Sequence, residues 1–380
     1  MRRPGSVRMT RRSVALAHRR VVNSRSAAAR GKRSLRTGRR RLARPQRQVT
    51  SGEGGQMSGE NTLGDVGEFA IIDRIVESVH VPATIAELGP GDDAAVVMAP
   101  DGRVVACVDV LVEGRHFRRD WSSAIDVGRR AAAASLSDVN AMGAVPTGLL
   151  VGLVAPTDLP TAWVSEMAAG LTQEAALAGA VLVGGDTTEG DAIVISVTAL
   201  GTLEGRDALT RGGAQVGDRI AVCGRLGWAA AGLAVLGRGF RSPKALVDAH
   251  RFPEIDYTAG KRAAAAGAHA MIDVSDGLIA DLGHIAAASG VDIDISTHDT
   301  SAFEVPEPMQ AAASAYNVDA KGWMLTGGED HALVGAFPAK GELPAGFVVV
   351  GSVTESRDDE PEVRVDGEVW PEPGGYSHFR

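Results

Sequence analysis

The sequence predicts an α/β protein with mixed sheets and two domains. Apolar runs of strand length alternate with longer Ala-rich segments of helical pattern, which is typical of sheets covered by helices. The chain has 380 residues, of which 44% are hydrophobic and 23% charged. This composition excludes a wholly disordered or fibrous protein, and the length favours two domains because single cores seldom grow beyond roughly 250 residues.

Residues 1–56 are predicted to be a disordered basic extension. They include 17 Lys and Arg but one acid, Glu53, and scarcely any apolar periodicity, so they cannot bury a core. Met57 stands just before the composition turns acidic and patterned, which favours an over-extended start codon or a dispensable tail. A transit peptide and an arm for anionic polymers are the functional alternatives.

The rest of the chain is a strongly acidic body, with 22 Lys and Arg against 46 Asp and Glu. Such a charge repels nucleic-acid phosphates, so a nucleic-acid-binding role is not favoured and would have to reside in the basic extension. Acidic clusters do suit divalent cations.

Cysteine content and hydropathy indicate a cytoplasmic protein. Cys107 and Cys223 are too few for a disulfide scaffold or a Cys-based zinc site and fit a reducing compartment. No apolar run approaches the roughly 18 residues of a membrane span, and the N-terminus lacks the apolar core of a signal peptide. We therefore expect no membrane contact.

The elements of the acidic body follow from its apolar periodicity. Apolar residues at Phe69, Ile72, Ile75, Val76 and Val79 share one face and predict an amphipathic helix. Further helical patterns cover residues 126–142, 161–179, 227–238 and 278–288. Strand-like runs cover residues 94–98, 104–108, 149–154, 181–183, 193–200, 219–222 and 347–350.

The order of these elements predicts mixed sheets rather than purely parallel ones. The runs at 94–98 and 104–108 are neighbours in the chain, whereas other strands alternate with helices. A domain boundary is expected near residue 206, where GlyThrLeuGluGlyArg closes a strand. The domains would then span residues 57–206 and 207–380.

Several acids stand after strands, in glycine-rich turns or in a helical segment. One of them alone is more typical of turn or capping chemistry, and Asp276 could simply cap the helix that follows it. Carboxylates that converge on one cleft, however, repel one another unless cations neutralise them, and Mg²⁺ prefers carboxylate oxygens and water. The candidates are Asp92, Asp93, Asp109, Asp138, Asp186, Asp273 and Asp276.

The common nucleotide-binding motifs are missing from the sequence. It contains neither a GxxxxGK[ST] phosphate loop nor the motif set of a protein kinase, and Gly224-Arg225-Leu226-Gly227 is only a fragment of a dinucleotide turn. Arg211, in ThrArgGlyGly, could grip a phosphate through two hydrogen bonds or be a solvated turn residue. His116 and Glu329 could contact a polar ligand or be structural.

The acidic body resembles the thiamine-monophosphate kinases, of the superfamily that also contains aminoimidazole ribonucleotide synthetase. The resemblance covers nearly all of it, because eight motifs occur in the family's order. They are GlyGluPheAlaIleIle at Gly67, GlyAspAspAla at Gly91, GluGlyArgHisPhe at Glu113, LeuSerAspValAsnAlaMetGlyAla at Leu136, GlyGlyAspThrThr at Gly184, AlaLeuThrArgGlyGly at Ala208, AspValSerAspGlyLeu at Asp273 and GlyGlyGluAsp at Gly327.

This resemblance implies a fold and an activity. The expected fold is the two-domain aminoimidazole ribonucleotide synthetase-like fold, in which N-terminal domains pair into a shared β-barrel in a homodimer. The expected reaction is direct transfer of the ATP γ-phosphoryl group to thiamine monophosphate, giving thiamine diphosphate and ADP. Joining two polyanions demands charge neutralisation and in-line positioning, so we expect no general base.

The resemblance also assigns roles to residues. Asp93, Asp109, Asp138, Asp186, Asp273 and Asp276 would be the Mg²⁺ ligands. Gly185, Asp186, Arg211 and Ser275 would bind ATP, and His116, Glu329 and Tyr376 would meet the thiamine phosphate.

One departure concerns Cys107-Val108-Asp109, where the family commonly has Ser-Thr-Asp, because the chain loses two hydroxyls there. A purine-biosynthesis cyclo-ligase and a selenophosphate synthetase are alternative members of the superfamily. A selenophosphate synthetase would be expected to carry a reactive cysteine near its N-terminus. The GlyGlyTyrSerHisPhe tail of this chain disfavours a purine-biosynthesis cyclo-ligase.

Overall fold

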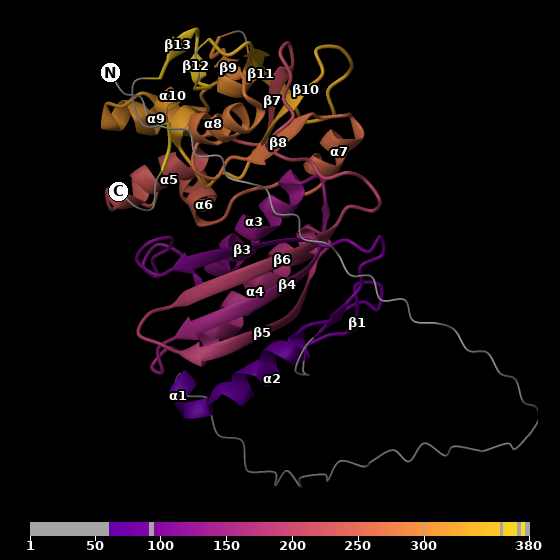
Figure 1. The fold of residues 1–380 in the computed structure, drawn as a ribbon. Helices are drawn as coiled ribbons and strands as arrows, with labels where there is room; N and C mark the ends of the chain where they lie inside the picture. Colours follow the sequence, from indigo (N-terminus) through magenta and orange to yellow (C-terminus); the bar gives the residue numbers. More distant parts are fainter. Residues whose placement is uncertain (1–60, 91–94, 299, 358–359, 371–373, 377–380) are drawn as a thin grey trace, which may run out of the picture. The chain divides into compact units, whose positions relative to one another are not determined.

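The computed structural model describes residues 61–380 apart from 91–94, 299, 358–359, 371–373 and 377–380 (Figure 1). The described residues belong to one compact unit, Ser58–Arg380. The basic extension, Asp92 and Asp93 lie outside the described residues, so the expectations for them stay predictions. Two large sheets and a two-stranded one lie among the described residues of the unit. We call residues 61–206 the N-lobe and residues 207–376 the C-lobe, dividing them where we expect the domain boundary.

A four-stranded sheet in the order β3-β6-β4-β5 forms the centre of the N-lobe. β4 and β5 are parallel and the other neighbours are antiparallel, so the predicted mixed sheet is confirmed. Alternation along β6 buries Ile195, Val197 and Ala199 on one face. The strands are β3 (Val105–Val112), β4 (Val145–Ala155), β5 (Val181–Glu189) and β6 (Val194–Thr202).

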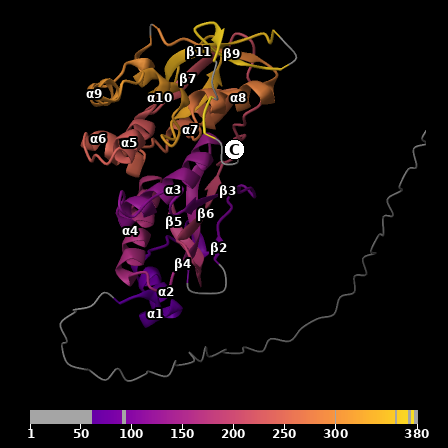
Figure 2. The same ribbon diagram turned by 90° about the vertical axis from the view of Figure 1, so that its left-hand side faces the viewer.

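Two helices, α3 (Ala124–Ala141) and α4 (Thr161–Leu177), cover that face of the sheet (Figure 2). Their backbones approach closely, since a Cβ at Gly128 would lie 2.0 Å from the carbonyl oxygen of Met167. The opposite face leaves Val108 60% and Val110 47% exposed. We call this second face the open face of the N-lobe sheet.

The residues before β3 form short elements. The predicted amphipathic helix is confirmed as α2 (Glu68–Ser78), which follows the short α1 (Leu63–Val66). Helix α2 packs against α4 and β5. The run at 94–98 contributes only β2 (Val96–Val97), and it pairs with β1 (Ala86–Leu88) instead of the next strand along the chain. β6 pairs with one edge of β3 along its whole length, and no described strand pairs with the other edge.

A seven-stranded sheet in the order β13-β12-β9-β11-β7-β10-β8 forms the centre of the C-lobe. Only β12 and β9 are parallel among its described pairs. The strands are β7 (Arg219–Cys223), β8 (Ala270–Asp273), β9 (Asp292–Ile295), β10 (Leu333–Phe337), β11 (Val348–Thr354), β12 (Val363–Val365) and β13 (Glu368–Val369).

Helices cover both faces of the C-lobe sheet unequally. The larger core joins one face to five helices, and a smaller core joins Ala221 and Met271 on the other face to α7 (Ala259–Ala265). The five are α5 (Trp228–Gly237), α6 (Lys244–Arg251), α8 (Leu278–Ser289), α9 (Glu307–Tyr316) and α10 (Ala320–Thr326), and a 3₁₀ turn, η1, spans Ser301–Phe303. Within the described part of the chain, no helix is both long and apolar enough to cross a lipid bilayer.

Helix α3 links the two lobes. It packs on its own sheet and also contacts β8, α6 and α7 of the C-lobe. The Asn140 amide near its C-terminal end donates to the carbonyl oxygen of Asp256 and accepts from the backbone N–H of Gly260, both at 3.0 Å. A Cβ at Gly260 would lie 1.7 Å from the carbonyl oxygen of Asn140, so the lobes meet here with no room for a side chain.

Gly260→Ala is therefore expected to destabilise the protein by about 3 kcal/mol, because two backbones must separate. Urea unfolding followed by circular dichroism measures the loss. Gly283→Ala in α8 is the matched control, since nothing lies within 4 Å of its Cβ position and the change should stabilise by up to about 1 kcal/mol. Equal stability of Gly260→Ala and wild type would contradict this account of the lobe contact.

Candidate functional site

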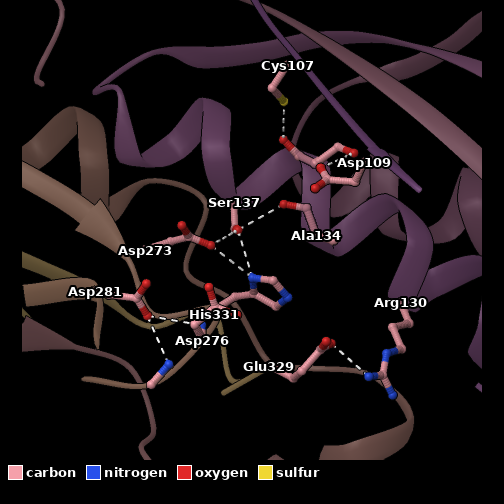
Figure 3. Close-up of polar contacts among 12 residues, drawn as sticks. Cys107, Asp109, Arg130, Ala134, Ser137, Asp273, Asp276, Asp281, Glu329 and His331 are labelled. Atoms are coloured by element: carbon pink, nitrogen blue, oxygen red, sulfur yellow. Dashed lines mark hydrogen bonds and ion pairs between the residues drawn. The ribbon is translucent and has the colours of Figure 1, made fainter. Parts of the chain in front are cut away.

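Carboxylates from both lobes converge where α3 meets the C-lobe (Figure 3). Asp109 comes from β3 and Asp138 from α3, whereas Asp273 ends β8 and Asp276 lies in the loop that leads to α8. Asp138 interacts electrostatically with both Asp109 and Asp273, and Asp273 interacts with Asp109. The structure thus brings together Asp109, Asp138 and Asp273, and Asp276 lies three residues beyond Asp273, in the loop that follows β8.

Strand alternation explains the placement of Asp109. Cys107 and Asp109 are two residues apart on β3 and therefore share the face that α3 covers. The Ser135 hydroxyl of α3 donates to Asp109 at 2.7 Å, and Asp138 lies three residues further along the same helix. One potential ligand atom from each of Cys107, Asp109 and Asp138 lies within 4.8 Å of the others.

The Cys107 thiol does not replace the missing hydroxyls as a ligand for a hard cation. Burial raises the pKa of Cys107, and the neighbouring Asp138 and Asp109 raise it further, so the thiol is protonated at neutral pH. Its sulfur lies 3.1 Å from the carbonyl oxygen of Ser135, to which the thiol donates. Oxygen donors at this corner therefore come from Asp109 and Asp138.

Burial and the repulsion between neighbouring carboxylates disfavour the charged forms of these acids and so raise their pKa values. Burial, with Asp273 and Asp109 nearby, raises the pKa of Asp138 to about 7. Burial also raises the pKa of Asp109, although the Ser135 hydroxyl acts against it. Half-buried oxygen donors that repel one another fit a divalent cation such as Mg²⁺, which prefers carboxylate ligands and would relieve the repulsion.

A hydrogen-bonded group joins the lobes at Asp273. The Ser137 hydroxyl of α3 lies 2.6 Å from Oδ2 of Asp273, and Nδ1 of His331 lies 2.9 Å from the same oxygen. Ser137 and His331 are themselves 3.0 Å apart. Burial alone would lower the pKa of His331, but Asp273, Glu329 and Asp138 raise it to about 9.

Glu329 joins the lobes a second time. Its carboxylate accepts a 2.7 Å hydrogen bond from Nη2 of the buried Arg130 on α3, and Nη1 of Arg130 donates to the carbonyl oxygen of His250. The Glu329 backbone N–H donates to the carbonyl oxygen of Ser275 at 2.9 Å. Two predicted ligand-binding residues, Glu329 and Ser275, therefore lie on adjoining segments beside the acids.

The loop before α8 is held by Asp281, whose Oδ2 accepts from the backbone N–H groups of Asp276 and Gly277 at 3.1 and 3.0 Å. The N-cap of α8 is Gly277, so the alternative that Asp276 simply caps this helix is wrong. The chain's last described segment docks on the same loop, where the Tyr376 N–H donates to the carbonyl oxygen of Asp276. The Tyr376 side chain is 59% exposed there.

The structure does not bring Asp186 to the other acids. Strand register aligns Asp109 with Val197, Val151 and Gly185 across the four-stranded sheet. Asp186 is one residue further along β5, so it lies on the open face, and β5 is three strands from β3, about 14 Å at the usual strand spacing. Gly185 shares the row of Asp109 but at the opposite edge of the sheet.

Arg211 and His116 also stand apart from the acids. The carbonyl oxygen of Arg211 accepts from Ser289 at the C-terminal end of α8, whereas Asp276 precedes the N-terminal end of that helix. His116 lies in the loop after β3, where its Nδ1 accepts the Val112 N–H at 3.0 Å and Nε2 therefore carries the proton. Their proposed ligand contacts stay predictions.

The glycine turn at Gly224–Gly227 is closed to a phosphate. Asp330 accepts the Ala229 N–H at 2.9 Å and so occupies the N-terminus of α5. A Cβ at Gly227 would lie 2.7 Å from the backbone of Met324. This supports the interpretation of the turn as an ordinary strand-to-helix connection.

Sequence reasoning missed Arg130, Ser137, Asp281 and His331. Ser137 precedes Asp138 and His331 follows GlyGlyGluAsp, so polar residues beside the motifs were the available signal. Their partners are not readable from sequence, because Ser137 and Asp273 are 136 residues apart.

The fold and the match to a family model define the class of the protein. The model described as AIR synthase related protein, N-terminal domain, matches residues 91–203. The structure of E. coli HypE, a hydrogenase maturation protein, superposes with a TM-score of 0.62 at 19% identity, covering 80% of this chain and 97% of that chain, and supports the fold alone. The matched segment, residues 91–203, thus belongs to the class of AIR synthase-related proteins.

More similar proteins narrow the assignment. The thiamine-monophosphate kinase of Mycobacterium tuberculosis is 48% identical over 318 residues, 84% of this chain and 93% of its own length. That of Corynebacterium glutamicum is 42% identical over 308 residues, 79% of this chain and 89% of its own length. The chain belongs to the thiamine-monophosphate kinase family.

Solved structures agree with this assignment. The crystal structure of thiamine monophosphate kinase from Aquifex aeolicus has a TM-score of 0.66 and 31% identity, covering 82% of this chain and 99% of that chain. A structure described as AaThiL complexed with AMPPCP and TMP has a TM-score of 0.67 and 31% identity, covering 83% and 97%.

The raised pKa of Asp138 predicts how pH affects stability without metal. A carboxyl with a higher pKa folded than unfolded loses stabilisation as pH rises between the two values, here from about 4 to about 7. Protein treated with EDTA should therefore melt at a falling temperature across this window, and Asp138→Asn should flatten the fall. Added Mg²⁺ should raise the melting temperature more at pH 7.5 than at pH 5. Identical pH profiles for the variant and wild type would contradict the burial of this charge.

Proposed function

We propose that the protein transfers the γ-phosphoryl group of ATP directly to the phosphate of thiamine monophosphate, giving thiamine diphosphate and ADP. The observation that carries the proposal is 48% identity over nearly the whole length of a thiamine-monophosphate kinase. The convergence of Asp109, Asp138, Asp273 and Asp276 from two lobes supports it, because the reaction joins two anions.

Charge neutralisation is the chemistry that this site offers. Asp109, Asp138, Asp273 and Asp276 would hold Mg²⁺, which neutralises the phosphate oxygens as they approach. The incoming phosphate is already a nucleophile, so no side chain needs to act as a general base. Arg130 and Ser137 fix the acids' surroundings from α3, and the chain's own hydrogen bonds set the geometry before substrate arrives.

The substrate contacts remain assignments from the family resemblance. Glu329 and Tyr376, with His116, would meet the thiamine phosphate, and the Tyr376 ring could face the cationic heterocycle. Ser275, Gly185 and Arg211 would contact ATP. The positions of Ser275, Glu329 and Tyr376 around the Asp276 loop support a shared binding region.

Two chains would pair through the open faces of their N-lobe sheets. Val108 and Val110 are exposed there, whereas Cys107 and Asp109 on the other face are half-buried and Leu111 is buried, and a shared barrel would cover the two valines. Asp186 lies on this face, in the same row as Val110. The pairing would give Asp186 surroundings that one chain does not provide. We place the enzyme in the cytoplasm.

Incubation of the protein with Mg²⁺-ATP and thiamine monophosphate should yield thiamine diphosphate and ADP in equal amounts, measured by chromatography. Thiamine, selenide and the formylglycinamidine precursor of aminoimidazole ribonucleotide are the control substrates for the superfamily alternatives. ADP formation with one of them, and none with thiamine monophosphate, would overturn the proposal.

The same assay should show turnover at least about 100-fold lower for Asp109→Asn and Asp276→Asn, since each removes a carboxylate that would hold the Mg²⁺ needed to offset phosphate repulsion. Their melting temperatures should stay within a few degrees of wild type. Asp319→Asn is the control, because Asp319 only caps α10. Normal turnover in both site variants would contradict the metal role.

Val108→Lys should convert a dimer to monomers, because it would bury a charge at the pairing face. Light scattering after size-exclusion chromatography measures the mass. Val216→Lys is the matched control, since Val216 is 62% exposed in the C-lobe and its variant should remain dimeric. A monomeric wild type would refute the pairing.

A further inference from the structure

His331 has a backbone conformation that is unfavourable for a residue with a side chain. It lies between the GlyGlyGluAsp turn and β10, with a φ of 52° in the left-handed region that residues other than glycine seldom adopt. Its N–H donates to the carbonyl oxygen of Val274 at 3.0 Å, and the residue is only 6% exposed. A buried polar ring on such a backbone needs a hydrogen bond that holds it in position.

The contacts of the ring are all on one side. Nδ1 bonds Oδ2 of Asp273 and approaches the Ser137 hydroxyl, whereas Nε2 is buried and has no hydrogen-bond partner among the described residues. The orientation of His331 therefore depends on Nδ1 alone. Asp273 in turn receives two donors on Oδ2, and its other oxygen takes part in neither bond.

We propose that His331 is a positioning residue for divalent-cation binding, which holds Asp273 of the C-lobe against Ser137 of the N-lobe. Ser137 directly precedes Asp138 on a rigid helix, so the contact fixes the spacing of two carboxylates that come from different lobes. The proposal rests on the metal role proposed above for Asp273. Partners that orient a metal ligand commonly change metal affinity by about 10- to 100-fold when they are removed.

Two amide variants separate the ring nitrogens. In His331→Asn the amide nitrogen is bonded to Cγ, as Nδ1 is, so it can donate to Asp273, and Asn tolerates the left-handed backbone. In His331→Gln the amide lies one carbon further out, nearer the place of Nε2. We expect His331→Asn to keep affinity within about threefold of wild type and His331→Gln to lose about tenfold or more.

The measurement is Mn²⁺ affinity of the full chain in the presence of AMPPCP, from the electron paramagnetic resonance signal of free Mn²⁺. His269→Gln is the matched control, because Nδ1 of His269 bonds Asp218 at 2.8 Å at the other end of β8, remote from the acids. It should leave Mn²⁺ affinity unchanged. Melting temperatures of all variants show whether each is folded.

Wild-type affinity in folded His331→Gln would overturn the proposal, as would equal losses in the two amide variants. If His331→Gln does not fold, Ser137→Ala removes the other donor to the same oxygen and should weaken Mn²⁺ binding by about tenfold, and an affinity within about threefold of wild type would then overturn the proposal. The outcome is independent of substrate identity. An Nδ1-dependent metal site in a protein without thiamine-monophosphate kinase activity would reject the proposed function but keep this inference.

Discussion

The burial of α3 in the cores of both lobes is the constraint on which the site depends. Most of this helix is buried, and its two ends are held by different partners, a capping box at Ser123 and the Asn140 amide against α7. Because a helix is stiff over this length, Ser135, Ser137 and Asp138 reach Asp109 on one side and Asp273 on the other without a flexible segment between them. The site is therefore as rigid as the packing that surrounds it.

The poor solvation and mutual repulsion of the buried carboxylates oppose this packing. Asp109 and Asp138 are partly buried side by side, and their pKa values rise because the charged forms are poorly solvated. Hydroxyls of Ser135 and Ser137 and the imidazole of His331 offset part of the cost, and each is supplied by a neighbouring element instead of by water. Such an arrangement holds carboxylates whose mutual repulsion a bound cation can relieve, and the same cation can then offset the charge of phosphates.

The apolar patterns of the sequence predicted many of the helices and strands, because each pattern depends only on residues within one element. The expected helices became α2, α3, α4, α5 and α8, and the expected strands all appeared, with 181–183 extending to β5. The helices α6, α7, α9 and α10 and the strands β8, β9, β10, β12 and β13 were missed, because they are short and their burial comes from the assembled C-lobe sheet. Motifs also identified the acids, but not which ones meet. Strand register places Asp186 on the open face, and His331 contacts Ser137, which is 194 residues away in the sequence. Both depend on contacts between distant segments, so local patterns could not predict them.

Alternate side chains of strand β3 face opposite sides of the sheet. Cys107 and Asp109 point to α3, while Val108 and Val110 point the other way. A slip of one residue in its pairing with β6 would exchange the two sets, turning a carboxylate outward and an apolar side chain into the charged cluster. The eight positions at which β3 pairs with β6 thus fix the inward carboxylate and the outward apolar side chains together, so neither set can change its face without the other.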